Sequence, residues 1–300
     1  MPDALPSPLP RRHDMAAPMT AYRPVAGGPG DGGGWRAAPL RPLARQWSRA
    51  TAPFLARAPL FPWRLGWTAR RLGSGQAGAL PLAHAERYFG TRLRLELDPA
   101  RLRWQLMDTV TDGRRTLRLA QLFLDGGDWS AAREPLAGSV VQQEMAALMD
   151  DGRPLQDSPI YRYMLSRIDE GRPEQRNAVR LATPALVDAY FAHYRALAGR
   201  IRSEGFLARD ALDRRFAASP LRSAAIERRE GEVGIAIGPD GEILRLLGGR
   251  HRTALAQLLR LPRMPVRVRL VHARWLLAEM DRHALPAPQA LLAGLHRLAG

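Results

Sequence analysis

The sequence of 300 residues contains no cysteine and no lysine, and each absence excludes a class of chemistry. Without cysteine there are no disulfides, no thiolate nucleophiles and no cysteine metal sites. Without lysine there is no P-loop lysine, no Schiff base and no attachment point for pyridoxal phosphate. All 45 basic residues are therefore arginine.

Long apolar runs are also missing. No run approaches the roughly 20 residues that a membrane-spanning helix needs. Residues 1–30 lack the apolar core of a secretory signal, and Arg11-Arg12 is not followed by one. The seven histidines show no HxxxH or HExxH spacing, so a transition-metal site is not expected. We expect a cytoplasmic protein without a transmembrane segment.

Charge of one sign dominates, with a formal net charge of +16. Such a balance suggests nucleic acid or another anionic partner, so DNA is a possible partner. However, arginine in place of every lysine, with abundant Ala, Gly, Pro and Leu, indicates the coding bias of a GC-rich bacterial genome. That bias raises the net charge without any partner. Residues 1–80 hold eleven arginines against three aspartates, so the basic charge is concentrated there.

Residues 1–80 are dense in Pro and Gly and predict a mostly disordered basic tail. Within it, residues 52–72 mix four Phe and Trp side chains with arginines. This segment could dock on a membrane surface or a partner, or it could be a linker that packs on the body. Pro53, Pro59 and Pro62 argue against one continuous helix there.

Residues 81–225 predict a mostly helical region that contributes one strand, at residues 92–97. Helices are expected at residues 140–149, 158–170 and 184–203. Ser158-Pro159 and Thr183-Pro184 each supply an N-cap followed by proline in the first turn. Two further short amphipathic runs lie at residues 102–110 and 116–124.

Residues 226–280 predict a small domain with a mixed sheet. The order is a strand at residues 232–237, a turn at Gly238-Pro239-Asp240-Gly241, a strand at residues 243–247, two glycines, a helix at residues 250–259 and a strand at residues 265–271. Residues 281–300 are expected to be a C-terminal helix or tail. The whole chain is therefore expected to be an α+β protein.

The junction between the second strand and the helix is the part of the chain that looks like a binding site. Gly248-Gly249 allows a sharp turn and close approach of a ligand to the backbone. The helix that follows offers N–H groups and a positive dipole end, which attract anions. Arg250, His251 and Arg252 add charge that would disfavour the helix alone, as happens at functional sites. The alternative is a plain tight turn with solvated arginines.

These residues carry a resemblance to a known superfamily. Gly248-Gly249-Arg250-His251-Arg252-Thr253-Ala254, preceded by a hairpin and followed by residues 261–266 (LPRMPV), resembles the core motif of the ParB/sulfiredoxin superfamily, closest to the ParB-like proteins with Gly-Gly-x-His-Arg. The likeness covers about residues 230–275. It implies a ParB/sulfiredoxin-like fold for this part of the chain. In that fold the two glycines and the basic residues after them, which we call the basic box (residues 248–253), bind the phosphates of a nucleotide, ATP or CTP, with Mg²⁺.

Carried over by position, the resemblance implies that Gly248, Gly249, Arg250, His251 and Arg252 contact the phosphates and that Thr253 opens the helix. Glu230 or Glu232 would then be the catalytic acid, base or Mg²⁺ ligand of a phosphotransferase or nucleotide hydrolase. Sulfiredoxin chemistry is excluded because Arg250 stands where that family has cysteine. Only some 25 residues follow the motif, too few for the DNA reader of ParB. A non-enzymatic DNA-binding protein, or a scaffold with a degenerate anion-binding box, remains the alternative.

Other polar residues have a structural explanation beside a functional one. His272 and Trp275 follow the last strand and could line the same pocket, although core packing also explains Trp275. His193 lies on the apolar face of a helix, which is typical of a core histidine. Asp128 and Asp157 could be acidic partners of the basic box, or could act only in a turn and a cap.

Overall fold

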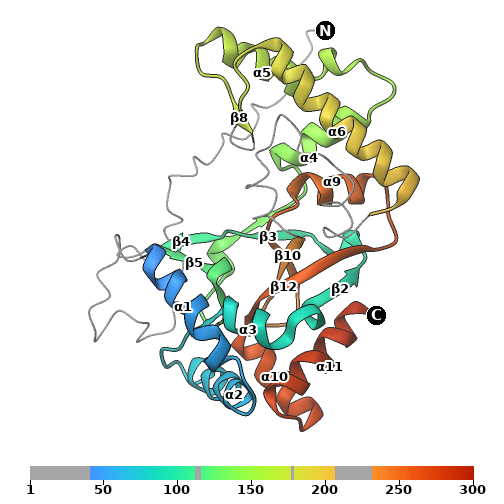
Figure 1. Ribbon diagram of the computed structural model, residues 1–300. Coiled ribbons are helices and arrows are strands. Elements are labelled where there is room, and N and C mark those ends of the chain that lie inside the picture. The colour runs from blue at the N-terminus through green and yellow to red at the C-terminus, as the bar shows by residue number, and fades with distance from the viewer. Residues whose placement is uncertain (1–40, 112–115, 177–178, 207–231) are drawn as a thin grey trace.

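A mixed β-sheet runs through the middle of the molecule, and helices lie above and below it in the view of Figure 1. The computed structural model describes residues 41–111, 116–176, 179–206 and 232–300. The fold is α+β, as the sequence predicts. The sheet has eight strands in the order β1-β6-β12-β10-β11-β3-β7, with β2 also paired to β12. These strands are β1 (Leu80–Pro81), β2 (Arg94–Leu97), β3 (Trp104–Leu106), β6 (Leu122–Asp125), β7 (Arg133–Pro135), β10 (Val233–Ile237), β11 (Ile243–Leu247) and β12 (Met264–His272).

The strand β12 holds the two parts of the chain together. It runs parallel to β10 and to β6, and antiparallel to β2. Parallel strands need a long crossover, and the connection between the parallel strands β10 and β12 passes through β11 and the helix α9 (Arg250–Leu258). All five residues of β10 are buried, as expected for a strand inside a sheet covered on both faces.

Two groups of helices cover the sheet. Above it in Figure 1 lie α4 (Val140–Met149), α5 (Pro159–Asp169) and α6 (Pro184–Glu204), which we call the helical layer, and α9 lies between this layer and the sheet. Below it lie α1 (Arg41–Leu55), α2 (Leu60–Gly73), α3 (Leu82–Phe89), α10 (Ala273–His283) and α11 (Ala287–Ala299). Two small hairpins, β4 (Thr109–Thr111) with β5 (Thr116–Arg118) and β8 (Gln175–Arg176) with β9 (Val179–Arg180), complete the described elements.

The elements with strong local signals are confirmed. The order strand, turn, strand, Gly-Gly, helix, strand appears as β10, β11, α9 and β12. At the turn, the N–H of Gly241, whose φ is 85°, donates to Gly238 O at 3.1 Å. The hydroxyl oxygens of Ser158 and Thr183 accept from backbone N–H groups at the starts of α5 and α6, as predicted.

Two predicted regions need correction. Residues 41–73, expected within a disordered tail, form α1 and α2, while residues 1–40 lie outside the described residues. The middle region contributes β2, β3, β6 and β7 to the main sheet, not one strand. The small domain expected at residues 226–280 therefore shares its sheet with the rest of the chain. Residues 281–300 form the end of α10 and then α11.

The prolines of the N-terminal segment do not prevent helix formation: Pro53 lies inside α1, near its end, and Pro59 falls between the two helices. Pro59 precedes α2 and Pro62 lies in its first turn, where the missing N–H costs nothing. The helix α2 buries Phe61, Leu65 and Leu72 in the main hydrophobic core. Tertiary packing of one apolar face therefore outweighs a composition that is typical of disorder.

We expect substitution of the buried face of α2 to destabilise the whole fold. Phe61 is 0% exposed, so Phe61→Ala should lower the free energy of unfolding by about 3–5 kcal/mol in urea denaturation. Trp63, two residues away, is 62% exposed, and Trp63→Ala should change that free energy by less than about 0.5 kcal/mol. Equal and small effects would show that α2 is not part of the folded body.

Candidate functional site

The glycine turn before α9 depends on two residues in the left-handed region. Gly248 has φ 73° and Gly249 has φ 62°, where side chains other than glycine are strained. A Cβ on Gly249 would also lie 2.5 Å from Val233 Cγ2. The turn therefore packs directly on the start of β10. The first N–H groups of α9 have no acceptor within the helix, so its amino end is a site of positive potential.

Arg269 and Glu232 lie beside this turn. A Cβ on Gly234 would meet Arg269 Cδ at 2.5 Å and the carbonyl oxygen of Leu247, next to Gly248, at 2.7 Å, so Arg269 extends over the ends of β10 and β11. Glu232, at the residue before β10, is only 5% exposed. Neither carboxylate oxygen of Glu232, nor Nε of Arg269, makes a hydrogen bond to any described residue.

The charges around Glu232 are close but not paired in hydrogen bonds. Arg94 Nε lies 3.7 Å from Glu232 Oε1, beyond hydrogen-bonding distance. Burial lowers the pKa of Arg269, and the nearby carboxylates, including Glu232, oppose that shift. Burial and the charge of Glu232 raise the pKa of Glu96 on β2. A buried acid beside a half-buried guanidinium, both with unused hydrogen-bonding capacity, is the strongest indication of a ligand in this region.

The basic residues of the box point in different directions. Arg250 is exposed at the start of α9, whereas His251 lies within the helical layer. Arg252 is buried, with its guanidinium 5.7 Å from the centre of the Phe206 ring. Thr253 is 1% exposed, and its hydroxyl makes no hydrogen bond to the described residues. Of the three basic side chains, Arg250 is therefore the one positioned in solvent at the glycine turn.

His251 joins a buried polar network in the helical layer. Its Nε2 lies 2.8 Å from the hydroxyl oxygen of Tyr190, and its ring stacks on Tyr194 with centroids 4.1 Å apart. The Tyr190 hydroxyl donates to Glu144 Oε2 at 2.5 Å. Since that hydroxyl has one hydrogen, Nε2 of His251 is the donor to the tyrosine oxygen. The network fixes α9 against α4 and α6.

Glu144 is the centre of this network and is 0% exposed. Its Oε1 accepts hydrogen bonds from two guanidinium nitrogens of Arg176, at 2.8 and 2.6 Å. Burial alone would raise the pKa of Glu144, but His251, Arg176 and Tyr190 outweigh it, so the pKa lies below its ordinary value. The same carboxylate and burial raise the pKa of Tyr190 well above its ordinary value. The sequence analysis did not predict this network. The one indication in the sequence was Glu144, a single acidic residue within a predicted helix that is otherwise without charge.

His272 has a structural role that its position explains. Its Nδ1 accepts from the N–H of Arg274, which caps α10, and its Nε2 donates to Gly127 O at 3.1 Å. Both ring nitrogens are used by the neutral form, and burial lowers the pKa of His272. The ring also contacts Trp129 edge to face at 5.1 Å. Trp275 packs in the core, 3% exposed, beside the Gly241 turn.

The remaining candidates have local roles. Asp128 Oδ1 accepts from the N–H of Ser130 at 2.9 Å, as in a turn. Asp157 is exposed in a short 3-10 helix before α5. The half-buried ring of His193 contacts Tyr194 at 4.9 Å, as expected of a histidine at the edge of a core. Glu230 lies outside the described residues.

Comparisons of this chain with protein families, curated proteins and solved structures found no match. Among the described residues, no helix has the length and apolar content needed to cross a membrane. Within the same part of the chain, no group of three or more His, Cys, Asp or Glu side chains could hold a metal ion.

Removing the charge of Glu144 should destabilise the fold strongly. Glu144→Gln leaves Arg176, which is 7% exposed, with one carboxylate fewer, and breaking a buried pair costs about 3 kcal/mol or more. Chemical denaturation measures this loss. The control is Glu170→Gln on α5, because the exposed pair of Glu170 with Arg167 should contribute less than about 1 kcal/mol. Similar losses in both variants would contradict a central role for Glu144.

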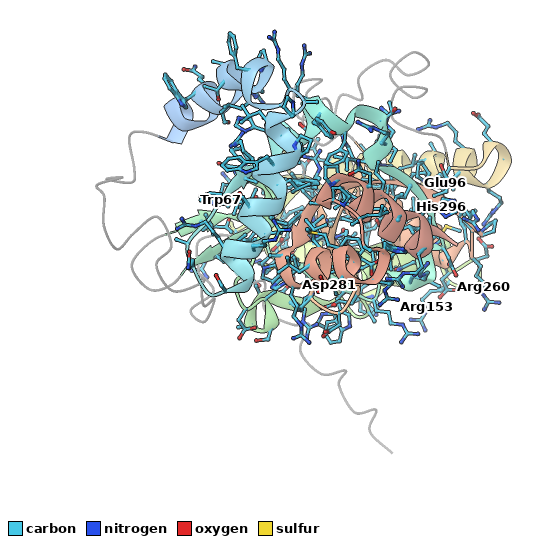
Figure 2. The ribbon with its side chains drawn as sticks, turned by 90° about the horizontal axis from the view of Figure 1, so that it is seen from below. Trp67, Glu96, Arg153, Arg260, Asp281 and His296 are labelled. Atoms are coloured by element: carbon cyan, nitrogen blue, oxygen red, sulfur yellow. The ribbon has the colours of Figure 1, made fainter. Side chains whose placement is uncertain are left out.

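His272 should make stability depend on pH. Because its folded pKa is below the unfolded value of about 6.5, its contribution is complete above that pH and is lost as the pH falls toward the folded pKa. The free energy of unfolding should therefore decrease as the pH falls below about 6.5. His272→Gln should reduce this decrease. The control His296→Gln, on the exposed side of α11 (Figure 2), should not alter it.

Proposed function

We propose that this protein binds the phosphate groups of a nucleotide, ATP or CTP, at the glycine turn before α9. The observation that carries the proposal lies beside that turn: both carboxylate oxygens of the buried Glu232 and the buried Nε atom of the half-buried Arg269 make no hydrogen bond to the described residues. Buried polar groups without partners are rare, and a bound ligand is one of the explanations for them. Their place beside a helix amino end selects an anion as the ligand.

The groups around the turn suit the chemistry of phosphate. The first N–H groups of α9 can donate to phosphate oxygens, and glycine at 248 and 249 allows the oxygens to come close to the backbone. Arg250 supplies an exposed guanidinium, and Arg269 supplies a half-buried one. In this proposal His251 does not touch the ligand. It positions α9, and so the donors at its amino end, through Tyr190.

Glu232 limits which anions fit. A carboxylate close to phosphate is repulsive unless a cation or a proton lies between them. Mg²⁺ is commonly held by one or two carboxylates together with the phosphates of the substrate, and Glu232 would be the one carboxylate here. The same group could accept a proton from an attacking hydroxyl or water, so phosphoryl transfer or nucleotide hydrolysis is the reaction class to test.

The resemblance of residues 230–275 to the ParB/sulfiredoxin superfamily supports nucleotide binding, and the relationship itself is part of the proposal. In the DNA-binding alternative, affinity would fall steeply with salt and would not depend on nucleotide. In the scaffold alternative, no anion would bind at the box. The nucleotide dependence and the salt dependence of binding distinguish these two alternatives from nucleotide binding.

Thermal unfolding of the full chain should shift with one nucleotide and Mg²⁺. Binding at 100 times Kd stabilises a protein by about 2.7 kcal/mol, which is visible as a higher Tm. Arg250→Ala should keep the fold, because the side chain is exposed, and should raise Kd roughly 10- to 100-fold by loss of a charged hydrogen bond. Arg153→Ala, an exposed arginine that is not at this turn, is the charge-matched control and should bind normally.

Glu232→Gln separates the role of the carboxylate from that of the arginines. It should lose the Mg²⁺-dependent part of nucleotide binding, yet bind inorganic phosphate at least as tightly, because a repulsive charge is removed. If the parent protein turns over the bound nucleotide, the rate of turnover should be lower in the Glu232→Gln variant. Absence of any Tm shift with ATP or CTP, with or without Mg²⁺, would refute nucleotide binding.

A further inference from the structure

Large apolar side chains are exposed along α1 and α2. Trp47 is 71% exposed, Phe54 66%, Trp63 62% and Trp67 44%. Figure 2 shows Trp67 at the margin of the molecule, on α2. We call these four side chains the aromatic surface. Exposed aromatic side chains gathered in one segment mark an interaction surface, whereas single exposed ones need no explanation.

The charge around the aromatic surface has one sign. Residues 41–73 contain seven arginines and no acidic residue, and the stretch without Asp or Glu extends from residue 32 to residue 85. Arg49 on α1, Arg70 on α2 and Arg57 in the link between the two helices are exposed. The coding bias of the chain explains arginine in place of lysine but not the absence of acids over this length. The partner of this surface should therefore be anionic.

The arrangement of the rings discriminates between anionic partners. Trp63 and Trp67 stack on each other, with centroids 5.8 Å apart and planes 15° apart. The guanidinium of Arg71 lies over the Trp67 ring at 4.7 Å, and that of Arg57 over Phe54 at 5.5 Å. Bases of single-stranded nucleic acid need open ring faces on which to stack. Rings partly covered by each other and by arginine suit instead the interfacial region of a lipid bilayer, where Trp and Arg side chains bury their apolar parts.

The surface is held in a fixed arrangement by the fold. His84 on α3 is 2% exposed and joins both helices. One ring nitrogen is 3.1 Å from Arg64 NH1 of α2, and the other is 3.1 Å from Ser48 O of α1. Phe61 and Leu65 anchor α2 in the core, which leaves the opposite side of the helix exposed. Because the two helices are already ordered, binding of a partner does not carry the entropic cost of ordering them.

We propose that α1 and α2 form a docking surface for a bilayer that contains anionic phospholipid. The aromatic side chains enter the headgroup region, and the arginines lie against the phosphates. Residues 1–40 carry four arginines and three aspartates, so this part of the chain has no net negative charge to match the surface. This binding is peripheral, and it does not depend on the glycine turn or on any nucleotide.

Co-sedimentation of the full chain with vesicles tests the proposal. The protein should bind mixed phosphatidylcholine and phosphatidylglycerol vesicles and should bind phosphatidylcholine vesicles much more weakly. Arg57→Gln with Arg70→Gln should weaken binding to the mixed vesicles roughly 30-fold, because each basic residue near an anionic surface contributes about fivefold. Trp63→Ser with Trp67→Ser should weaken it at least as much.

Matched controls keep the result specific. Trp104 on β3 is 42% exposed and lies under the guanidinium of Arg133, so Trp104→Ser removes a similar ring from another surface. Arg153→Gln removes an exposed arginine, which lies at the opposite margin from Trp67 in Figure 2. Both controls should bind vesicles like the parent chain. Unchanged thermal unfolding shows that each variant is folded.

Three outcomes would overturn the proposal. The first is equal binding to neutral and mixed vesicles, or no binding to either. The second is binding to single-stranded oligonucleotides, but not to vesicles, that is lost in the Trp63→Ser, Trp67→Ser variant. The third is a dimer in sedimentation that this variant converts to monomer, because a second copy of the chain would then cover the surface.

Discussion

The arrangement of the helical layer on the sheet depends on one buried carboxylate, that of Glu144. It accepts from Arg176 on the small β8–β9 hairpin, from Tyr190 on α6, and through Tyr190 it is linked to His251 on α9. Because α9 is also the crossover between β11 and β12, its position sets where the glycine turn meets β10. A charge buried this deeply is stable only while every partner is in place, which makes the network cooperative. The amino end of α9 is thus fixed from within the protein.

The groups beside the glycine turn differ from this network, because Glu232 and Arg269 have buried polar atoms that make no hydrogen bond to the described residues. An unsatisfied buried polar group costs about 1–3 kcal/mol, and the carboxylate of Glu232 carries that cost beside a turn with two residues at positive φ. Nε of the half-buried Arg269 is unsatisfied as well. A fold that satisfies Glu144 completely could have satisfied these groups as well. The contrast between the two clusters is the physical reason to place a ligand at the glycine turn and not among the residues around Glu144.

Sequence patterns correctly predicted the turns and helix caps that depend on residues close together along the chain. The hairpin turn at Gly238, the caps at Ser158 and Thr183, and the glycine turn followed by α9 all follow from local preferences, and each is present. The short strands β3 and β7 were missed because three residues carry too little periodicity. The helices α1 and α2 were missed because Pro and Gly content describes the chain as a whole, whereas burial of Phe61 depends on distant residues. Within the site, the burial of Glu232 and Arg269 and the turning of His251 into the helical layer depend on contacts between elements.

The same distinction between composition and position applies to the charge. Several arginines contribute to the formal +16 without any effect on partners, because Arg176, Arg245 and Arg252 are buried and Arg176 is held by carboxylates. The arginines of α1 and α2 are different: they lie in a stretch without acids, and Arg49, Arg57 and Arg70 are exposed among exposed tryptophans. Net charge alone would assign one anionic partner to the whole chain. The distribution instead separates arginines that hold the interior together, arginines that border the glycine turn, and arginines that face solvent on the two N-terminal helices. The last two of these groups have charge available for another molecule, and they lie on different elements of the fold.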